Sequence, residues 1–183
     1  MTEREGYYGY LNHKFKAQGE TKDEEGWVVA WTDGSKIETG DGEKAGAGIF
    51  YGAGNPRNRS CAVGGRQTSQ RGELTAFLEC MEKDERKLVV RTDSRYVQLG
   101  ATVGLQKWKK TAWYSKPLKA KYIENIDLWK RVDKAISRRE NPVKVEWVKA
   151  HGLPRHIAAG LTTEVDIWGN DGADLAAGRA ARA

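Results

Sequence analysis

The sequence contains little cysteine and no long apolar run. Its two cysteines, Cys61 and Cys80, form no Cys-x-x-Cys pair and lie on different expected elements, so we expect free core thiols in a reducing compartment rather than a disulfide. No apolar run approaches the ~18 residues that span a bilayer. The polar start, Met1–Glu5, is unlike a signal peptide. These absences predict a soluble intracellular protein without a membrane partner, in either cytoplasm or nucleus.

The sequence is well supplied with charge and with hydrophobic residues. Its 183 residues, 39% of them hydrophobic, predict one domain with a real core. Lysine and arginine number 31 against 25 acids, and the formal net charge of +6 favours a polyanionic partner. Repeats and low-complexity tracts are absent from the sequence.

Residues 1–26 differ in character from the rest of the chain. They mix charges with Tyr7, Tyr8 and Tyr10 and show no sustained hydrophobic period. We expect a flexible or partial N-terminal segment here. The alternative is the edge of another nucleic-acid-binding module, because lysines flank the tyrosines. The domain itself is expected over residues 27–183.

Hydrophobic patterning over residues 27–183 predicts an α/β domain. Ser69 is expected to cap a helix whose apolar residues recur at helical spacing, and Asn170 is expected to cap the last helix. Residues 36–44 and the long stretch 152–169 are expected to be loops. The expected strands are 27–31, 45–51, 58–64, 88–92 and 143–148, and a further helix is expected over about 123–138.

Four acids lie beside expected core faces. Asp33 and Asp93 each follow a buried strand, at the edge of a sheet where α/β proteins bind ligands, while Glu73 and Asp174 flank apolar helix stripes. Packed together without a cation, four carboxylates would repel one another and raise each other's pKa. Hard divalent ions bound by oxygen ligands remove this difficulty, and Mg²⁺ is the usual ion where phosphates are handled. Two such ions roughly 4 Å apart can drive phosphodiester hydrolysis.

These acids stand in motifs that together resemble type 1 ribonuclease H, from about Trp27 to the C-terminus. The motifs are Thr32-Asp33-Gly34-Ser35, Gly72-Glu73-Leu74, Thr92-Asp93-Ser94, Val148-Lys149-Ala150-His151 and Asn170-Asp171-Gly172-Ala173-Asp174-Leu175-Ala176. The resemblance implies a ribonuclease H-like fold, with a five-stranded mixed sheet and helices on both faces. The stretch Asn55–Arg59 is similar to ribonuclease H domains of fungal transposable elements.

The same resemblance implies roles for the site residues. Asp33, Glu73, Asp93 and Asp174 would be the catalytic acids, binding two Mg²⁺ ions for which Mn²⁺ can substitute. His151 would match the mobile histidine that assists proton transfer and product release. His156, in the long 152–169 stretch, is an alternative candidate for that role.

A basic, aromatic stretch at 107–122 is the main candidate for substrate contact. Lysines there can meet phosphates while flat aromatics stack on sugars or bases; the alternative is a solvated helix face with two core tryptophans. The residues of this stretch that we assign to nucleic-acid binding are Lys107, Trp108, Lys109, Lys110 and Trp113.

Five more contacts are implied by the resemblance. Arg66, Thr68 and Asn125 match a phosphate pocket for the DNA strand, and Ser69 and Gln70 match residues that read the RNA minor groove, where the 2′-hydroxyl marks RNA. Ser69 replaces a common asparagine. Gly104 stands where many relatives carry a second tryptophan against the DNA, so we expect this protein to lack that interaction.

The sequence thus predicts a metal-dependent endoribonuclease, expected to be monomeric, that hydrolyses the RNA strand of RNA–DNA hybrids and leaves 5′-phosphate and 3′-hydroxyl ends. Two alternatives remain open: a non-catalytic hybrid-binding module, and a DNA-directed nuclease or transposase of the same fold. Whether the chain is a free-standing enzyme or part of a polyprotein does not follow from its sequence.

Overall fold

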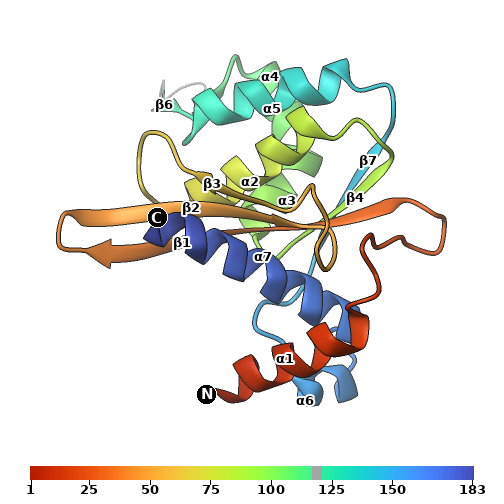
Figure 1. Ribbon diagram of the computed structural model, residues 1–183. Coiled ribbons are helices and arrows are strands. Elements are labelled where there is room, and N and C mark those ends of the chain that lie inside the picture. Colours follow the sequence, from red (N-terminus) through yellow and green to blue (C-terminus); the bar gives the residue numbers. More distant parts are fainter. Residues whose placement is uncertain (117–120) are drawn as a thin grey trace.

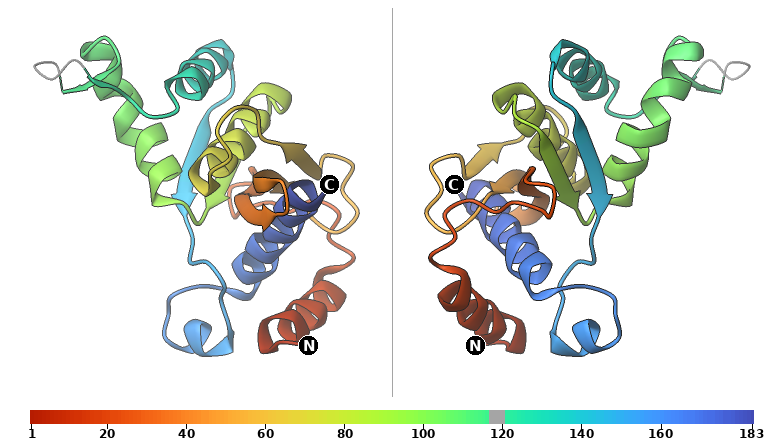
Figure 2. Two further views of the ribbon diagram at one scale, coloured as in Figure 1. Left: turned by 90° about the vertical axis from the view of Figure 1, so that its left-hand side faces the viewer. Right: turned by 90° about the vertical axis from the view of Figure 1, so that its right-hand side faces the viewer.

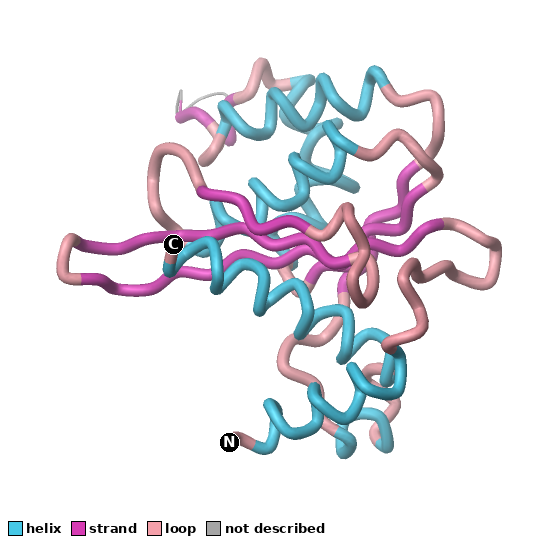
Figure 3. Tube along the Cα trace, viewed as in Figure 1, coloured by secondary structure: helices cyan, strands magenta, loops and turns pink. Residues whose placement is uncertain are grey.

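A computed structural model describes residues 1–116 and 121–183. Its centre is a five-stranded sheet in the order β3-β2-β1-β4-β7 (Figures 1 and 3). The strands are β1 (Val28–Thr39), β2 (Gly42–Phe50), β3 (Arg59–Ala62), β4 (Leu88–Thr92) and β7 (Val143–Trp147). A separate pair is formed by β5 (Tyr114–Lys116) and β6 (Lys121–Tyr122).

The sheet is mixed, as the sequence predicts. Strands β1, β2 and β3 form an antiparallel meander, whereas β1, β4 and β7 run parallel to one another. In the parallel part Thr32 of β1 pairs with Thr92, the last residue of β4, and β1 continues beyond this pair beside β2. The residues that follow these two threonines, Asp33 and Asp93, are therefore neighbours at the point where β4 ends.

Helices cover both faces of the sheet (Figures 1 and 2). On one face lies α2, with α3, α4 and α5 on the same side of the sheet, and on the other lies α7, with α1 and α6 farther from the sheet. The described helices are α1 (Glu3–Phe15), α2 (Ser69–Lys83), α3 (Arg95–Leu99), the π-helical turn η1 (Gly100–Gly104), α4 (Leu105–Lys110), α5 (Ile126–Arg138), α6 (Pro154–Ala158) and α7 (Glu164–Arg182). None of these is long and apolar enough to cross a membrane.

Each face of the sheet has its own apolar core. Beneath α2 and α5 the core includes Leu74, Phe77 and Trp129, and beneath α7 it is built from Trp31 and Trp168 with their neighbours. Cys61 and Cys80 are free thiols, as expected. Strand residues that are apolar on consecutive positions fill both cores, which is why Val28 to Trp31 is buried throughout.

Small residues set the distance between α7 and the sheet. A Cβ added at Gly48 would lie 2.2 Å from the carbonyl oxygen of Ala173, and one at Gly46 would lie 2.2 Å from that of Ala177. Backbone atoms cannot give way to such a contact. The glycines of β2 and the alanines of α7 therefore allow a close approach that brings Asp174 toward the sheet edge.

Several local expectations were wrong. Thr68, not Ser69, is the N-cap of α2: its hydroxyl accepts a hydrogen bond from the Arg71 backbone nitrogen, and Ser69 is the first helical residue. Residues 36–44 are not a polar loop, because β1 and β2 continue through them to a tight turn. Helix α2 therefore includes Ser69, and strands β1 and β2 are both longer than expected.

The stretch 152–169 is also more ordered than expected. It contains α6 and the first turns of α7, which begins at Glu164 with Thr163 as its N-cap. Asn170 is therefore not a cap. It lies inside α7, where it is buried.

The N-terminal residues form helix α1 rather than a flexible segment. Thr2 and Glu5 cap its first turn through reciprocal hydrogen bonds of 3.1 and 3.4 Å. Leu11 is fully buried against the α7 core, and the Trp168 indole donates to Asn12 Oδ1 at 3.1 Å. These contacts dock α1 on α7.

Candidate active site

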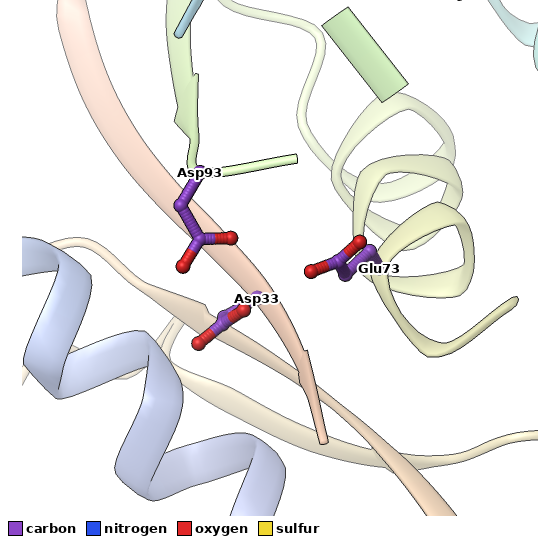
Figure 4. Close-up of side chains that lie close together, drawn as sticks. All are labelled: Asp33, Glu73 and Asp93. Carbon is purple, nitrogen blue, oxygen red and sulfur yellow. The ribbon is translucent and has the colours of Figure 1, made fainter. Parts of the chain in front are cut away.

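Three carboxylates meet at the carboxyl edge of the sheet. Asp33, Glu73 and Asp93 each offer an oxygen atom, and these oxygens lie within 4.8 Å of one another. Figure 4 shows the three side chains pointing toward one another from β1, α2 and the end of β4. The sequence prediction that these acids converge is therefore confirmed for three of its four members.

Local packing explains the convergence. Asp33 and Asp93 directly follow Thr32 and Thr92, the last residues that pair between the parallel strands β1 and β4, so their spacing follows from strand pairing. Glu73 joins them because α2 approaches β1 at Gly34, where an added Cβ would lie 2.3 Å from the Glu73 backbone nitrogen. Only glycine permits this approach.

The carboxylates are poorly neutralised by the protein. Burial, followed by repulsion from Asp93, Asp174 and Glu73, raises the pKa of Asp33 well above its usual value, although the Gly34 N–H donates to it. Burial raises the pKa of Glu73 to about 7, with a hydrogen bond from Ser94 opposing the shift and repulsion from Asp93 adding to it. No lysine or arginine among the described residues forms an ion pair with Asp33, Glu73 or Asp93.

Asp174 lies near the other three acids but outside their tight group. Its charge contributes to the raised pKa of Asp33, yet its Oδ2 accepts a hydrogen bond from Arg4 Nη2 at 2.9 Å. Arg4 comes from α1 and also donates to Asp171 Oδ1, through Nε at 3.1 Å and Nη2 at 2.8 Å. Burial raises the pKa of Asp171 even though Arg4 opposes the shift.

Two further contacts hold Asp93 in place. Asn170 Nδ2 donates to Asp93 Oδ2 at 3.3 Å, while the buried Asn170 Oδ1 has no hydrogen-bond partner among the described residues. The Trp147 indole donates to the Asp93 carbonyl oxygen at 3.1 Å. The Arg95 guanidinium lies 3.8 Å from the centre of the Trp147 ring, and Trp147 is 37% exposed.

His151 lies beside this site, as predicted. It is exposed, has a left-handed backbone (φ 53°), and lines an open groove of 570 Å³ together with Asp93, Trp147 and Lys149. Its electrostatic interaction with Asp171 lowers the pKa of that carboxyl group, against the larger effect of burial. His156 is engaged elsewhere: its Nδ1 accepts a hydrogen bond from the Leu153 backbone nitrogen at 2.9 Å, at the start of α6.

The residues expected to form a phosphate pocket also come together. Arg66, Thr68 and Asn125 line a cavity of 310 Å³ between the start of α2 and the start of α5. Arg71 and Asp127 line it too, joined by two hydrogen bonds of 2.9 and 2.5 Å. Thr68 has its hydroxyl occupied by the helix cap.

Ser69 and Gln70 are exposed on the first turn of α2. Gln70 precedes Glu73 by three residues, so both lie on the same side of the helix. The predicted RNA contacts thus adjoin the acid cluster.

The basic stretch 107–122 combines tryptophans that pack on the core with lysines that are exposed. Trp108 and Trp113 pack against the α2 core, and the Trp108 ring centroid lies 5.2 Å from that of Trp129, as the core alternative expects. Lys107, Lys109 and Lys110 are exposed on α4, and Lys109 pairs with Asp133 at 3.2 Å. Residues 117–120 of this stretch lie outside the described residues.

Sequence reasoning missed several residues of these sites, among them Asn170, Trp147, Arg71, Asp127 and Arg4. Asn170 could have been found, because its i−4 spacing from Asp174 places both on one helix face. Arg71 and Asp127 carried no local signal, since they meet across 56 residues. Arg4 gave none either, because only the docking of α1 brings it to the site.

A ribonuclease H-like sheet with converging acids at its carboxyl edge defines the class of this protein. The chain belongs to the RNase H family: the family model described as RNase H matches residues 25–182. The carboxylate cluster is compatible with the divalent-metal dependence that this family implies. The narrower resemblance to fungal transposable elements stays a prediction.

Named relatives agree with this assignment. A ribonuclease H of Schizosaccharomyces pombe (strain 972) is 34% identical over 155 residues, which cover 84% of this chain and 52% of the relative. A ribonuclease H of Escherichia coli (strain E24377A) is 35% identical over 127 residues, covering 68% of this chain and 77% of the relative. The chain spans about half the length of the first curated relatives it matches.

Solved structures show the same fold. The solution structure of the prototype foamy virus (PFV) RNase H domain superposes with a TM-score of 0.65 at 25% identity, covering 84% of this chain and 93% of that one. LC9-RNase H1, a type 1 RNase H with the type 2 active-site motif, gives a TM-score of 0.59 at 26% identity, covering 84% of this chain and 71% of the other.

Proposed function

We propose that this chain is an endoribonuclease that hydrolyses the RNA strand of RNA–DNA hybrids with Mg²⁺ as its cofactor. The observation that carries this proposal is the meeting of Asp33, Glu73 and Asp93 within 4.8 Å, without an ion pair to any described lysine or arginine. Membership of the RNase H family supports the substrate class. A binding module without catalysis would not need three mutually repelling, partly buried acids.

The donor set fits a hard divalent cation. Its ligands are carboxylate oxygens, and the pKa values of Asp33 and Glu73 are raised by burial and repulsion that a bound cation would relieve. Asp33, Glu73, Asp93 and Asp174 would hold two Mg²⁺ ions, with Mn²⁺ as a substitute. Bound there, such ions supply activation of the attacking water and stabilisation of the leaving oxygen.

The remaining residues position the acids and handle protons. Asn170 and Trp147 fix the carboxylate and the carbonyl of Asp93. His151 is exposed beside Asp93, where an imidazole can donate or accept a proton. Its proposed task is to protonate the departing 3′-oxygen and assist product release, leaving a 5′-phosphate.

Exposed residues beside the site explain how a hybrid would be chosen. Ser69 and Gln70, one turn before Glu73, would contact the RNA minor groove and its 2′-hydroxyls. The cavity at Arg66, Thr68 and Asn125 would take a phosphate of the DNA strand. Arg71 is paired with Asp127, which leaves Arg66 as the cation of this cavity that forms no ion pair among the described residues. The lysines of α4 would contact further DNA phosphates.

A cleavage assay tests this function. Labelled RNA–DNA hybrid, double-stranded RNA and double-stranded DNA of one sequence are each incubated with the protein in Mg²⁺, Mn²⁺ or EDTA. We expect metal-dependent cleavage of the RNA in the hybrid alone. Cleavage of DNA would indicate a DNA-directed nuclease, and tight hybrid binding without cleavage in either metal would indicate a binding module.

A further inference from the structure

Helix α1 places one arginine against the active-site helix. Arg4 Nη2 contacts Asp174 Oδ2 at 2.9 Å, while Nε and Nη2 both contact Asp171 Oδ1. Arg4 and Asp174 lie 170 residues apart in the chain, so the contact depends on the docking of α1. The charge on Asp174 is thus neutralised by the protein itself, unlike that on Asp33, Glu73 or Asp93.

The two partners of Arg4 are not equivalent. The Asp171 side chain is 5% exposed and receives two hydrogen bonds, so it anchors the guanidinium. The Asp174 side chain is 31% exposed and receives one, so it can turn away while Arg4 stays on Asp171. Asp174 is also the acid that lies outside the group of oxygens within 4.8 Å.

Contacts independent of Arg4 keep α1 in place. Leu11 is fully buried, Asn12 accepts from Trp168, and Lys14 Nζ pairs with Glu164 at 2.7 Å. The capping contacts of Thr2 and Glu5 fix the first turn that carries Arg4. Arg4 is therefore held at the site by a docked helix and can be replaced without undocking it.

From these contacts we infer that Arg4 is a positioning residue that competes with a divalent ion for Asp174. Metal binding at Asp174 requires its carboxylate to leave Arg4 and turn toward Asp33. The N-terminal helix thereby raises the metal concentration at which the site is completed. This inference rests on the proposed role of Asp174 as a metal ligand.

The test measures metal binding without nucleic acid. Mg²⁺ is titrated calorimetrically into wild type, Arg4→Gln, Asp174→Asn and the double variant, and bound Mn²⁺ is counted by electron paramagnetic resonance. We expect Arg4→Gln to tighten apparent Mg²⁺ affinity roughly 2- to 5-fold, the effect of losing one partly exposed ion pair. In the Asp174→Asn background the same replacement should change nothing.

Lys14→Gln is the matched control. It removes a charge and an α1–α7 ion pair without touching Asp171 or Asp174, so Mg²⁺ affinity should stay at the wild-type value. Circular dichroism of each variant reports whether α1 and the fold persist, and Arg4→Lys, which keeps the charge, serves if Arg4→Gln does not fold. Its single ammonium group cannot hold Asp171 and Asp174 as the guanidinium does, so it should tighten Mg²⁺ affinity in the same direction but less.

The outcomes separate this inference from the proposed function. An unchanged or weaker affinity in Arg4→Gln, beside a loss of metal in Asp174→Asn, would overturn the role of Arg4 and leave the metal site intact. An effect of Arg4→Gln that persists in the Asp174→Asn background would show a long-range charge effect and overturn competition. Wild-type metal binding by Asp174→Asn would overturn the ligand assignment itself.

Discussion

Gly34 and Glu73 are in contact so close that no side chain fits between their elements: a Cβ at Gly34 would lie 2.3 Å from the Glu73 backbone nitrogen. The contact is between β1 and α2, and it places a helix-borne carboxylate against one carried by a strand. The acid cluster therefore depends on a residue that bears no functional group.

Replacing Gly34 by alanine should separate α2 from β1. We expect the free energy of unfolding to fall by about 1–3 kcal/mol, as for other overpacked sites, and metal affinity to weaken because Glu73 moves away from Asp33. Urea unfolding and Mg²⁺ calorimetry measure the two effects. Gly40→Ala is the control, since a Cβ there meets no atom within 4 Å. A Gly34→Ala protein that matches wild type in both measurements would refute the explanation.

The raised pKa of Glu73, about 7 against its ordinary 4.5, predicts how metal-free stability varies with pH. Between these two values the folded state holds more protons than the unfolded state. The free energy of unfolding therefore falls as pH rises through this window, and the Glu73 contribution is level above it.

Urea unfolding in EDTA from pH 4.5 to 8 measures this dependence. Asp33 contributes in the same direction, so the informative quantity is the difference between wild type and Glu73→Gln. We expect the variant to have the shallower fall with pH. Glu85→Gln, an exposed residue far from the site, should follow wild type, and a Glu73→Gln curve parallel to wild type would exclude Glu73 as the source.

The exposed lysines of α4 should determine the salt dependence of hybrid binding. Lys107→Ala and Lys110→Ala should each reduce the slope of log affinity against log salt by about 0.7–0.9 for each phosphate that the lysine neutralises. Lys109→Ala should have a smaller effect because Asp133 already shares its charge. Lys87→Ala, before the amino end of β4, is the control. Equal slopes in all four variants would show that α4 does not meet the substrate.

Replacing His151 and replacing His156 should have different effects on turnover and stability. His151→Ala should slow turnover by about 10²-fold, the lower end for general acid–base catalysis, while Mg²⁺ dependence is kept. His156→Ala removes an acceptor at the start of α6 and should cost some stability but little turnover. Single-turnover and steady-state rates for both variants provide the comparison. Slow turnover in His156→Ala beside normal turnover in His151→Ala would reverse the assignment.

Much of the site could be predicted because it follows from strand periodicity. Asp33 and Asp93 each end an apolar run, and parallel pairing of those runs is enough to make them neighbours. Glu73 could be placed because it flanks a helical apolar stripe. The five-stranded mixed sheet and the helices on both of its faces followed from the motifs.

Two features could not be predicted, for physical reasons. Helix α1 buries only Leu11 completely, so it leaves almost no periodic signal in the sequence. The start of α7 was misplaced because Asn170, polar and followed by Gly172, has the composition of a cap, although tertiary packing buries it against Asp93. The position of Arg4 could not be predicted either, because only the docking of helix α1 brings it to the site.

The central claim is that the converging acids are a catalytic metal site, and Asp33→Asn tests it most directly. Asp33 is 4% exposed, accepts the Gly34 N–H, and can be replaced by an isosteric neutral side chain. Hybrid cleavage, hybrid affinity and metal-free melting temperature are measured together with wild type. We predict that cleavage is abolished, that hybrid affinity is largely kept, and that the melting temperature in EDTA rises because a buried, repelled charge is gone. An Asp33→Asn protein that cleaves hybrid at the wild-type rate in Mg²⁺ would contradict the account.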